Sequence, residues 1–399
     1  MVRSLLIVGC VLHLSCASAP RTAPAAASTP KLEPLPSADH LPYLSPEQIV
    51  ERLESSKAKY RVEPDDSPPG GAADALWPLG IEPVDVPQVV VKDGRRVVQR
   101  WPLEPKLEAL MAQAVEHYEA KRYSEAEKIS RQLLAQCPDC YLGFEYLGQI
   151  ALARGAPSAA LEYFRQAARL NPDDSRLHEG MGSALVRLGR LSEAREALAW
   201  ALVLSPRDPH LRKQLRNLEG VGLVFKGDVL IPRGMAYQKG EDMIILYDPL
   251  YGPAWLAFGA CKALWHMDPA HRQEMTGKTE HYFNSAEDYE CVSAAALVHE
   301  AQRAGTVAGP VDSTLDRLLD VIRDDLFSQM VLFETMARIH PQITLTLDDE
   351  SRKRMWQFVL KHVLVPAFES RDADARGPAN PPRGLSGVRL MRGDASGVW

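Results

Sequence analysis

Three prolines at a constant interval constrain the fold of this chain more than any other feature. Pro138, Pro172 and Pro206 lie 34 residues apart, and each opens a turn after a run of residues with helical spacing. Proline cannot continue a helix, so each one separates one unit from the next. Small residues recur with the same period at aligned positions, namely Ala126, Ala160 and Ala194, Gly148 and Gly182, Gly155 and Gly189, and Ala167 and Ala201. This period predicts stacked helical hairpins, none of which buries a core alone.

The phased pattern resembles the tetratricopeptide repeat, in which each unit is a pair of antiparallel helices. Units 141–174 and 175–208 match it closely, whereas unit 107–140 has Lys121 where the other two have the turn glycine. The resemblance implies that the small residues let the paired helices approach, and that residues 209–218 form a closing helix. It therefore predicts a mostly α-helical chain with an α-solenoid of three repeats and a closing helix over 107–218.

The resemblance also implies a binding surface, because the first helix of each hairpin lines the concave face of such a stack. The positions expected on that face are Glu145, Gln149, Leu152, Arg176, Glu179, Ser183 and Arg187. The family's clamp for a peptide carboxylate uses lysine, asparagine and arginine, and this set is absent. The resemblance instead implies a mixed polar and apolar groove for a peptide or a partner helix. A face that is merely solvated is the alternative interpretation.

The first residues have the pattern of a secretory signal. Arg3 precedes an apolar run, and small residues follow around Cys16. The tripeptide that ends at Cys16 resembles the bacterial lipobox, so we expect residues 1–16 to be a signal peptide and Cys16 to carry a lipid. Cleavage after Ala19 without a lipid is the alternative.

The segment after Cys16 is expected to be a tether rather than a folded element. Residues 17–40 are rich in proline, alanine and serine and poor in large apolar groups. A lipid followed by a tether places the chain in the cell envelope, and we expect the periplasmic side of the outer membrane.

Export bears on the remaining cysteines, because disulfides form in oxidising compartments. Cys137 and Cys140 could close a bond across one turn, and Cys261 could pair with Cys291. A redox role for the first pair is the alternative, but no strand precedes it and no βαβ pattern surrounds it. Structural disulfides are therefore favoured.

The repeats are flanked by an expected N-terminal arm, 41–106. Ser45 begins a helix that is predicted to reach Tyr60, and residues 64–79 are predicted to form a loop. Valine runs on both sides of a Lys-Asp-Gly-Arg turn indicate a β-hairpin that packs on the first repeat.

Residues 219–369 are expected to form a mainly helical C-terminal domain. Residues 220–240 are predicted to be a β element or an irregular connector, and helices are predicted over 253–267, 286–303, 315–339 and 349–365. The tail 370–399 is rich in glycine, proline, arginine and aspartate and is expected to be disordered.

Motifs for catalysis or nucleotide binding are incomplete. Residues 276–279 resemble the end of a P-loop, but Arg272 stands where its first glycine belongs. His299 lacks the second histidine of a zinc-protease helix, because that place is Arg303. A net charge of -6 without a basic run argues against nucleic-acid binding. We therefore expect no catalytic set, no cofactor, no nucleotide and no metal ligands.

Together these patterns favour a non-catalytic protein–protein interaction scaffold of the cell envelope, whose concave face binds a protein partner in an envelope assembly. The alternative is an enzyme or metal-binding protein with its site in the C-terminal helical domain and the repeats as a docking arm. A third hypothesis is a purely structural protein in which the repeats pack against the C-terminal helices and the groove is closed.

Overall fold

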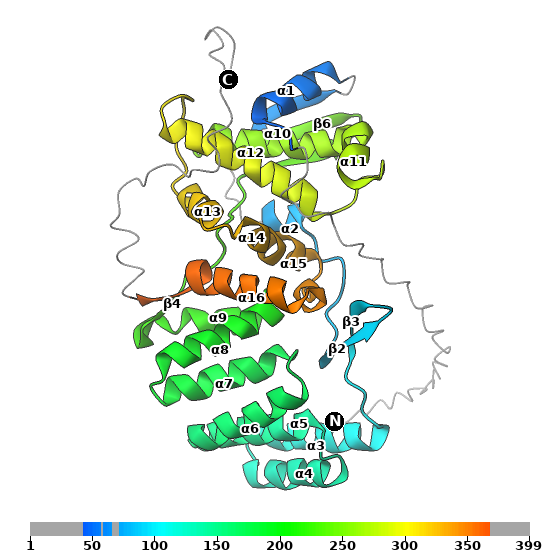
Figure 1. Cartoon of the computed structure of the whole chain (residues 1–399), viewed down its shortest axis with the longest axis vertical. Helices are drawn as coiled ribbons and strands as arrows, with labels where there is room; N and C mark the ends of the chain where they lie inside the picture. Colours follow the sequence, from blue (N-terminus) through cyan, green and yellow to red (C-terminus); the bar gives the residue numbers. More distant parts are fainter. Residues whose placement is uncertain (1–42, 57–58, 66–71, 368–399) are drawn as a thin grey trace, which may run out of the picture. The chain divides into compact units, whose positions relative to one another are not determined.

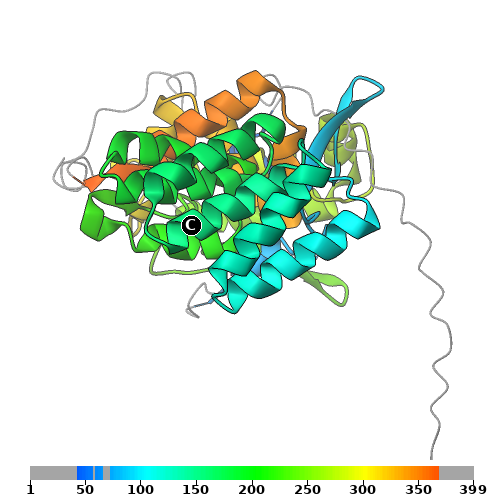
Figure 2. The same cartoon turned by 90° about the horizontal axis from the view of Figure 1, so that it is seen from below.

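Three antiparallel helix pairs and a single closing helix make up the repeat region (Figure 1, Figure 2). Their bounds are α3 Pro105–Glu119, α4 Tyr123–Gln136, α5 Tyr141–Ala153, α6 Pro157–Leu170, α7 Ser175–Arg187, α8 Leu191–Leu204 and α9 Pro209–Arg216. Proline begins α3, α6 and α9, where its missing N–H removes no helical hydrogen bond. The predicted mostly α-helical stack is confirmed, and α9 follows it at the place of the expected closing helix.

The structure is a computed structural model that describes residues 43–56, 59–65 and 72–367. The expected signal peptide, Cys16, the tether 17–40 and the tail 370–399 lie outside the described residues. Within the described residues, no helix combines the length and the apolar character needed to cross a bilayer.

The turn inside each hairpin has the same left-handed backbone conformation in all three units. Gly155 and Gly189 have φ angles of 75° and 72°, in the left-handed region that glycine adopts freely. Lys121 holds the equivalent place in the first unit with a φ of 58°. A non-glycine residue pays about 1 kcal/mol or more for this conformation. The repeat turn is therefore imposed on the first unit by packing rather than by its local sequence.

Glycines on the first helices let the second helices pack closely. A Cβ on Gly182 would lie 2.5 Å from Leu198 Cγ, and one on Gly180 would lie 2.5 Å from the Phe164 ring. Phe164 is fully buried, so its ring has no open space into which it can move.

The substitution Gly180→Ala is expected to lower the free energy of unfolding by about 1–3 kcal/mol, as overpacking does. This net loss remains after the roughly 1 kcal/mol gained in helix propensity. Urea unfolding measures it, and Gly220→Ala is the control, because nothing lies within 4 Å of the methyl group added there. An equal effect of the two substitutions would contradict the packing argument.

The N-terminal arm is more structured than its sequence predicts. α1 Pro46–Ser55 begins with a capping box between Ser45 and Gln48, but the helix ends before the predicted Tyr60. Strand β1 Tyr60–Pro64 follows and runs parallel to β6 Asp242–Tyr247. A short helix, α2 Ala72–Leu76, lies in the stretch predicted to be a loop. The prediction was wrong for β1 because its partner strand is distant in the sequence.

Strands β2 and β3 form the expected hairpin. Their bounds are β2 Pro87–Lys92 and β3 Arg95–Arg100. Both turn residues have positive φ angles, as the favoured hairpin turns require. Arg100 pairs with Glu108 of the first repeat at 2.9 Å, and Arg96 pairs with Asp349 of the C-terminal region at 2.7 Å. The hairpin therefore contacts the C-terminal region as well as the predicted first repeat.

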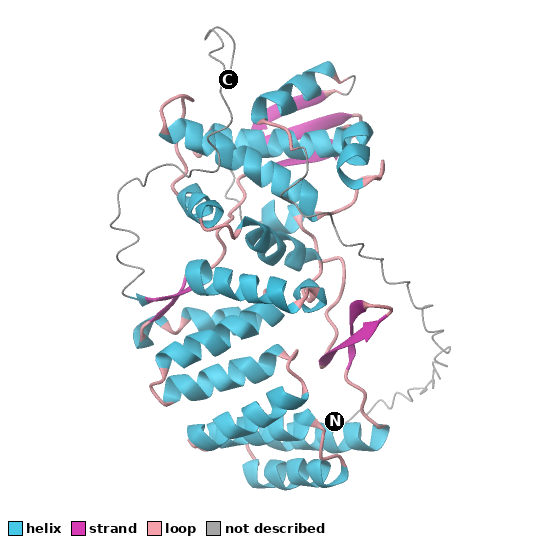
Figure 3. Cartoon of the chain, viewed as in Figure 1, coloured by secondary structure: helices cyan, strands magenta, loops and turns pink. Residues whose placement is uncertain are grey.

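The C-terminal region combines helices with short strands (Figure 3). Its elements are η3 Glu219–Val221, β4 Leu223–Phe225, β5 Gly234–Lys239, β6, α10 Pro253–Met267, α11 Pro269–Thr276, α12 Ser285–Arg303, α13 Thr314–Arg323, α14 Phe327–Val331, η4 Leu332–Met336, α15 Ala337–Ile339, η5 Ile343–Thr346, α16 Asp349–Phe358, η6 Val359–Val363 and β7 Leu364–Pro366. One sheet has the strand order β1-β6-β5, and β4 pairs with β7. The stretch 220–240 is therefore partly β structure, as one of the two predictions had it.

Two predicted helices are interrupted. The helix expected over 315–339 breaks at Asp325, whose φ is 57°, and then widens into the π-helical turn η4. The helix expected over 349–365 begins after the cap Asp348 but ends in the π-helical turn η6, and its last residues form β7. Apolar spacing does not detect the positive φ of Asp325, nor the pairing of the last residues with β4 that ends the second helix.

One hydrophobic core extends from the third repeat into the C-terminal region. It includes Leu198 of α8, Trp255 of α10 and Phe358 of α16. Trp200 of α8 stacks on Trp356 of α16 with ring centroids 5.9 Å apart. The last hairpin is therefore covered by C-terminal elements, in addition to α9.

Candidate partner-binding surface

The predicted binding face is divided into a buried part and an accessible part. Glu145 is 3% exposed and Leu152 is 7% exposed, so neither offers appreciable surface to a partner. The other predicted positions are partly or fully accessible, namely Gln149, Arg176, Glu179, Ser183 and Arg187. The seven residues therefore do not act as one surface.

An N-terminal segment packs on the face at the start of α5. Within the expected N-terminal arm 41–106, residues 77–103 are called the arm from here on. Figure 1 shows them running from α2 through the β2–β3 hairpin to α3. Trp101 packs edge-on against Tyr141 of α5 with ring centroids 4.8 Å apart. Val86 is 4% exposed and belongs to the same apolar cluster. The arm therefore occupies the face at the start of α5.

A group of interacting polar side chains lies beside the arm. The Tyr141 hydroxyl donates to Asp174 at 2.8 Å, and Arg176 Nη2 lies 2.6 Å from the same carboxylate. Glu145 Oε2 is 3.7 Å from Arg176 and accepts no hydrogen bond from the described residues. Burial raises the pKa of Glu145 to about 7. The negative charges of Asp174 and Asp85 raise this pKa further, whereas Arg176 lowers it. Arg176 is thus engaged by carboxylates of its own chain.

The raised pKa of Glu145 makes the stability of the protein depend on pH. The folded value of about 7 exceeds the ordinary value of 4.5. The contribution of the protonated group is therefore fully present below the ordinary value and is lost as the pH rises through the folded value. Glu145→Gln imitates the protonated form and is expected to raise the free energy of unfolding by on the order of 2 kcal/mol above about pH 8, with little effect near pH 4.

Urea unfolding of the wild type and of Glu145→Gln across this pH range measures the difference. Glu125→Gln removes a similar charge from an exposed position on α4 and serves as the control. A difference between Glu145→Gln and the wild type that stays constant with pH would contradict the assigned shift.

The accessible part of the face lies nearer the ends of the first helices. We define the open strip as Tyr118, Tyr146, Gln149, Ser183 and Arg187. The rings of Tyr118 and Tyr146 have centroids 6.4 Å apart, and Ser183 accepts a hydrogen bond from α9 at 2.7 Å. Arg187 donates to a backbone carbonyl of α5 and so links α7 to α5. The open strip therefore combines aromatic, polar and cationic groups from α3, α5 and α7.

A cleft of about 890 Å³ lies beside the covered part of the face. Three segments contribute to its walls: Asp74 with the first residues of the arm, the repeat turns around Asp173 and Asp208, and residues around Arg338. Arg176 is the one predicted site residue among those that line it. The cleft thus adjoins the predicted face at the start of α7.

One wall of the cleft is stiffened by arginines that share a carboxylate. Arg207 and Arg338 each lie 3.0 Å from Asp228, and Arg212 lies 2.8 Å from it. Burial would raise the pKa of Asp228, but Arg207 and Arg212 lower it to about 2. Asp228 therefore stays ionised and holds the arginines in place.

Sequence reasoning missed this cleft. Its walls come from segments near residues 80, 175, 206 and 340, and no period or motif connects them. The arm residues Glu82 and Asp85 fell in a proline-rich stretch without a recognisable pattern. The hydrogen bonds between Val84 and Gln342, both 2.8 Å long, attach this stretch of the arm to the C-terminal region.

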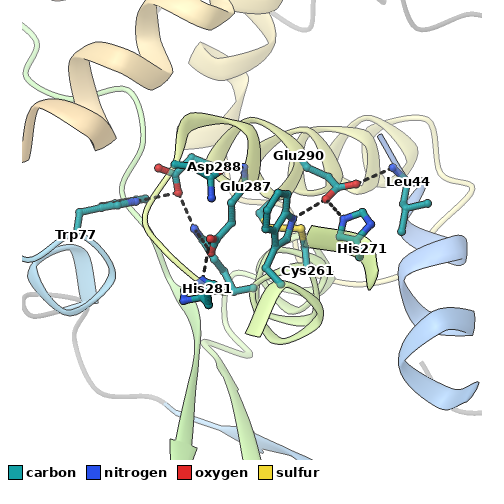
Figure 4. The surroundings of a disulfide bond; sticks show 12 residues. Leu44, Trp77, Cys261, His271, His281, Glu287, Asp288 and Glu290 are labelled. Carbon is teal, nitrogen blue, oxygen red and sulfur yellow. Dashed lines mark hydrogen bonds and ion pairs between the residues drawn. A yellow bond between two sulfur atoms is a disulfide. The ribbon is translucent and has the colours of Figure 1, made fainter. Parts of the chain in front are cut away.

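Buried charges surround a disulfide in the C-terminal region (Figure 4). The structure joins Cys261 of α10 to Cys291 of α12. Lys262 Nζ lies 2.5 Å from Asp288 and 2.9 Å from Glu287, and the lysine side chain is 4% exposed. Burial would lower the pKa of Lys262, but Asp288 and Glu287 raise it above its usual range. This cluster joins α10 to α12 and has little access to solvent.

A second group of polar contacts lies on the other side of that disulfide. Glu290 accepts hydrogen bonds from Trp265 at 2.6 Å and from the backbone N–H of Leu44 at 2.8 Å. His271 lies 2.8 Å from the same carboxylate. Figure 4 shows Leu44 and His271 directed toward Glu290. They attach α11 and the start of the N-terminal region to α12.

Two histidines of the C-terminal region lie together, His266 and His281, with ring centroids 4.0 Å apart, and others contact separate carboxylates. His271 contacts Glu290, His281 contacts Glu287, and His299 contacts Asp316. In the part of the chain that the structure describes, no three histidine, cysteine, aspartate or glutamate side chains are placed to hold a metal ion.

A second disulfide lies at the turn between the first and second repeats. It joins Cys137 to Cys140 across three residues. Cys140 is buried and precedes α5, so the bond fixes the turn where that helix begins.

Comparisons with known proteins identify the repeats. Two family models, both described as tetratricopeptide repeat, match residues 111–175 and 151–216. No curated protein matches the sequence of the chain.

Several solved structures are similar to part of the chain. One is the Yersinia enterocolitica type III secretion chaperone SycD in complex with a peptide of the translocator YopD, which is 22% identical over 30% of this chain and 91% of that chain, with a TM-score of 0.27. Another is the first TPR domain of human RPAP3, at 17% identity over 29% and 91%, with a TM-score of 0.28. A third is the TPR2B domain of yeast Sti1 in a complex with pHsp70, at 14% identity over 30% and 94%, with a TM-score of 0.27.

Proposed function

We propose that this chain, whose residues 111–216 are tetratricopeptide repeats, is a non-catalytic scaffold that binds a protein partner through those repeats. Stacked helical repeats present extended surfaces and commonly serve in protein–protein interaction. The observation that carries the proposal is the open strip, which leaves aromatic, polar and cationic groups of three helices accessible beside the arm. Tyrosine and arginine contribute disproportionately to binding energy at interfaces.

A peptide or an amphipathic helix is the partner element that the open strip favours. The strip crosses successive first helices, so a segment lying along it contacts α3, α5 and α7 in turn. The arm excludes the same segment from the start of α5, where Trp101 and Val86 already pack. The proposed contact is therefore confined to the uncovered part of the face.

Photo-crosslinking tests this proposal. A photoreactive phenylalanine derivative at Gln149, in the open strip, is expected to capture a partner in the native envelope. The same group at Glu125, on the second helix of the first repeat, is the control and is expected to capture none. Arg187→Glu should abolish the Gln149 product because it reverses the charge of the strip. Equal products at both positions, or none at Gln149, would contradict the proposal.

We also propose that the protein acts in the cell envelope and is anchored by a lipid on Cys16. The secretory pattern before Cys16 supports this proposal, as do the two disulfides, which persist in oxidising compartments. Labelled palmitate should enter the wild type but not Cys16→Ser, and the variant should leave the membrane fraction. A wild type that carries no label would favour cleavage after Ala19 instead.

A further inference from the structure

The charges in the cleft beside the arm are not balanced. The walls carry six carboxylates and three guanidinium groups, from Asp74, Glu82, Asp85, Asp173, Asp174 and Asp208 and from Arg176, Arg207 and Arg338. Each guanidinium group already lies against an aspartate of this chain, either Asp174 or Asp228. Two of the six carboxylates are also paired, Asp173 with Arg352 at 2.8 Å and Asp74 with Arg338 at 3.3 Å. The positive charges are therefore engaged, and the surplus in the cleft is negative.

The surplus lies mainly on the arm. Glu82 and Asp85 are exposed, and neither forms a hydrogen bond or an ion pair with its side chain among the residues that the structure describes. Asp208 adds a carboxylate on the facing wall, where one of its oxygens accepts from the first N–H groups of α9. Two walls thus present negative charge toward the same space.

The arm is held in this place against local strain and repulsion. Val86 has a φ of 53°, a conformation that is costly for a β-branched residue. Asp85, next to it, repels the buried Glu145. The apolar contacts of Val86 and the hydrogen bond from Asn171 to the Pro87 carbonyl, 2.9 Å long, oppose these costs. A cation in the cleft would offset the repulsion.

The cleft and the open strip share helix α7, which carries Arg176 near its start and Ser183 and Arg187 farther along. Arg176 lines the cleft and stands on the first helix of the third repeat. Pro209 lines it as well, and the next residue, His210, contacts Glu179 on α7 at 3.2 Å. A segment that follows α7 from the open strip toward the start of that helix therefore reaches the cleft.

We propose that this acidic cleft docks an extended, arginine- or lysine-bearing segment of the partner protein. The inference rests on the proposed function and names the partner chemistry at this end of its surface. Charge complementarity between a guest cation and two unpaired carboxylates would set the orientation of the bound segment and speed its association. The apolar groups of Leu79 and the arm prolines would contact the stem of the guest side chain.

Fluorescence anisotropy tests the inference with the full chain and a labelled peptide of repeated Gly-Pro-Arg triplets. Wild-type protein is expected to bind this peptide and not the matched Gly-Pro-Glu peptide. The double variant Glu82→Gln/Asp85→Asn should weaken binding by about tenfold, because both unpaired charges are lost. The control Glu125→Gln/Asp139→Asn makes the same change of net charge at exposed positions outside the cleft and should bind like the wild type.

Equal weakening in the two double variants would overturn the inference, because the attraction would then come from net charge alone. Binding of spermidine without binding of the arginine peptide would also overturn it, and would make the cleft a polyamine site. The Gln149 photo-crosslink separates this failure from failure of the proposed function. A captured partner together with no arginine-peptide binding rejects only the cleft, whereas no captured partner rejects the scaffold proposal itself.

Discussion

Replacing Lys262 with methionine is expected to lower the free energy of unfolding by about 3–5 kcal/mol. The substitution leaves Asp288 and Glu287 close together and buried without their cation. Burial would raise the pKa of Glu287, but Lys262 lowers it to about 2. This carboxylate is therefore ionised at neutral pH, and a small rise of its pKa would not neutralise it in the variant. Removal of one member of a buried ion pair is destabilising because the remaining charge is unsolvated.

Urea unfolding at neutral pH measures this effect, and Lys361→Met is the control. Lys361 pairs with Asp324 at 2.5 Å, but its side chain is 57% exposed, so its loss should cost no more than about 1 kcal/mol. Adding Glu287→Gln and Asp288→Asn to Lys262→Met should restore part of the stability, since no buried charge would remain unpaired. Equal losses in the two single variants would mean that the Lys262 cluster is solvated.

Removal of the Cys261–Cys291 bond is the second large effect, with an expected loss of about 3–4 kcal/mol. The bond closes a segment whose ends are separated by 30 residues, and it therefore restricts the unfolded chain strongly. Alanine at both positions is the suitable change, because both side chains are fully buried. Thermal unfolding of the double variant should show the loss as a lower Tm.

The Cys137–Cys140 bond provides the comparison, because its cysteines are only three residues apart. Alanine at both of these positions should cost about 2 kcal/mol or less, since so short a loop restricts the unfolded chain little. If the two double variants lost the same stability, loop length would not govern the contribution of these disulfides. The native strain of one of them would then have to be considered instead.

The sequence predicted the repeat region well because its contacts are local. Gly148 and Gly182 meet side chains of the next helix, Phe164 and Leu198, and both pairs are sixteen residues apart. Such contacts leave a periodic record in the sequence. The strands β1 and β7 were not predicted because they pair with β6 and β4, which are distant in the sequence. The break at Asp325 was not predicted because apolar spacing does not detect a positive φ.

The candidate site was only partly predictable. Gln149, Ser183 and Arg187 are accessible at the predicted face, but Glu145 and Leu152 are buried. The phase of a helix shows which side chains share a face, and it does not show which other segment covers that face. The arm packs on this face at the start of α5, whereas the sequence predicted only that its β-hairpin packs on the first repeat.

By itself the sequence determined the period, the hairpins and the identity of the first-helix face, because these follow from helix geometry and neighbouring packing. The tertiary structure decided which part of that face stays open, where the acidic cleft lies and how the buried charges are paired. Two of the hydrogen bonds that fix these features join Trp77 to Asp288 and Val84 to Gln342. The bonded residues are 211 and 258 positions apart in the sequence. Contacts across such separations are selected by the folded core as a whole, so no local pattern records them.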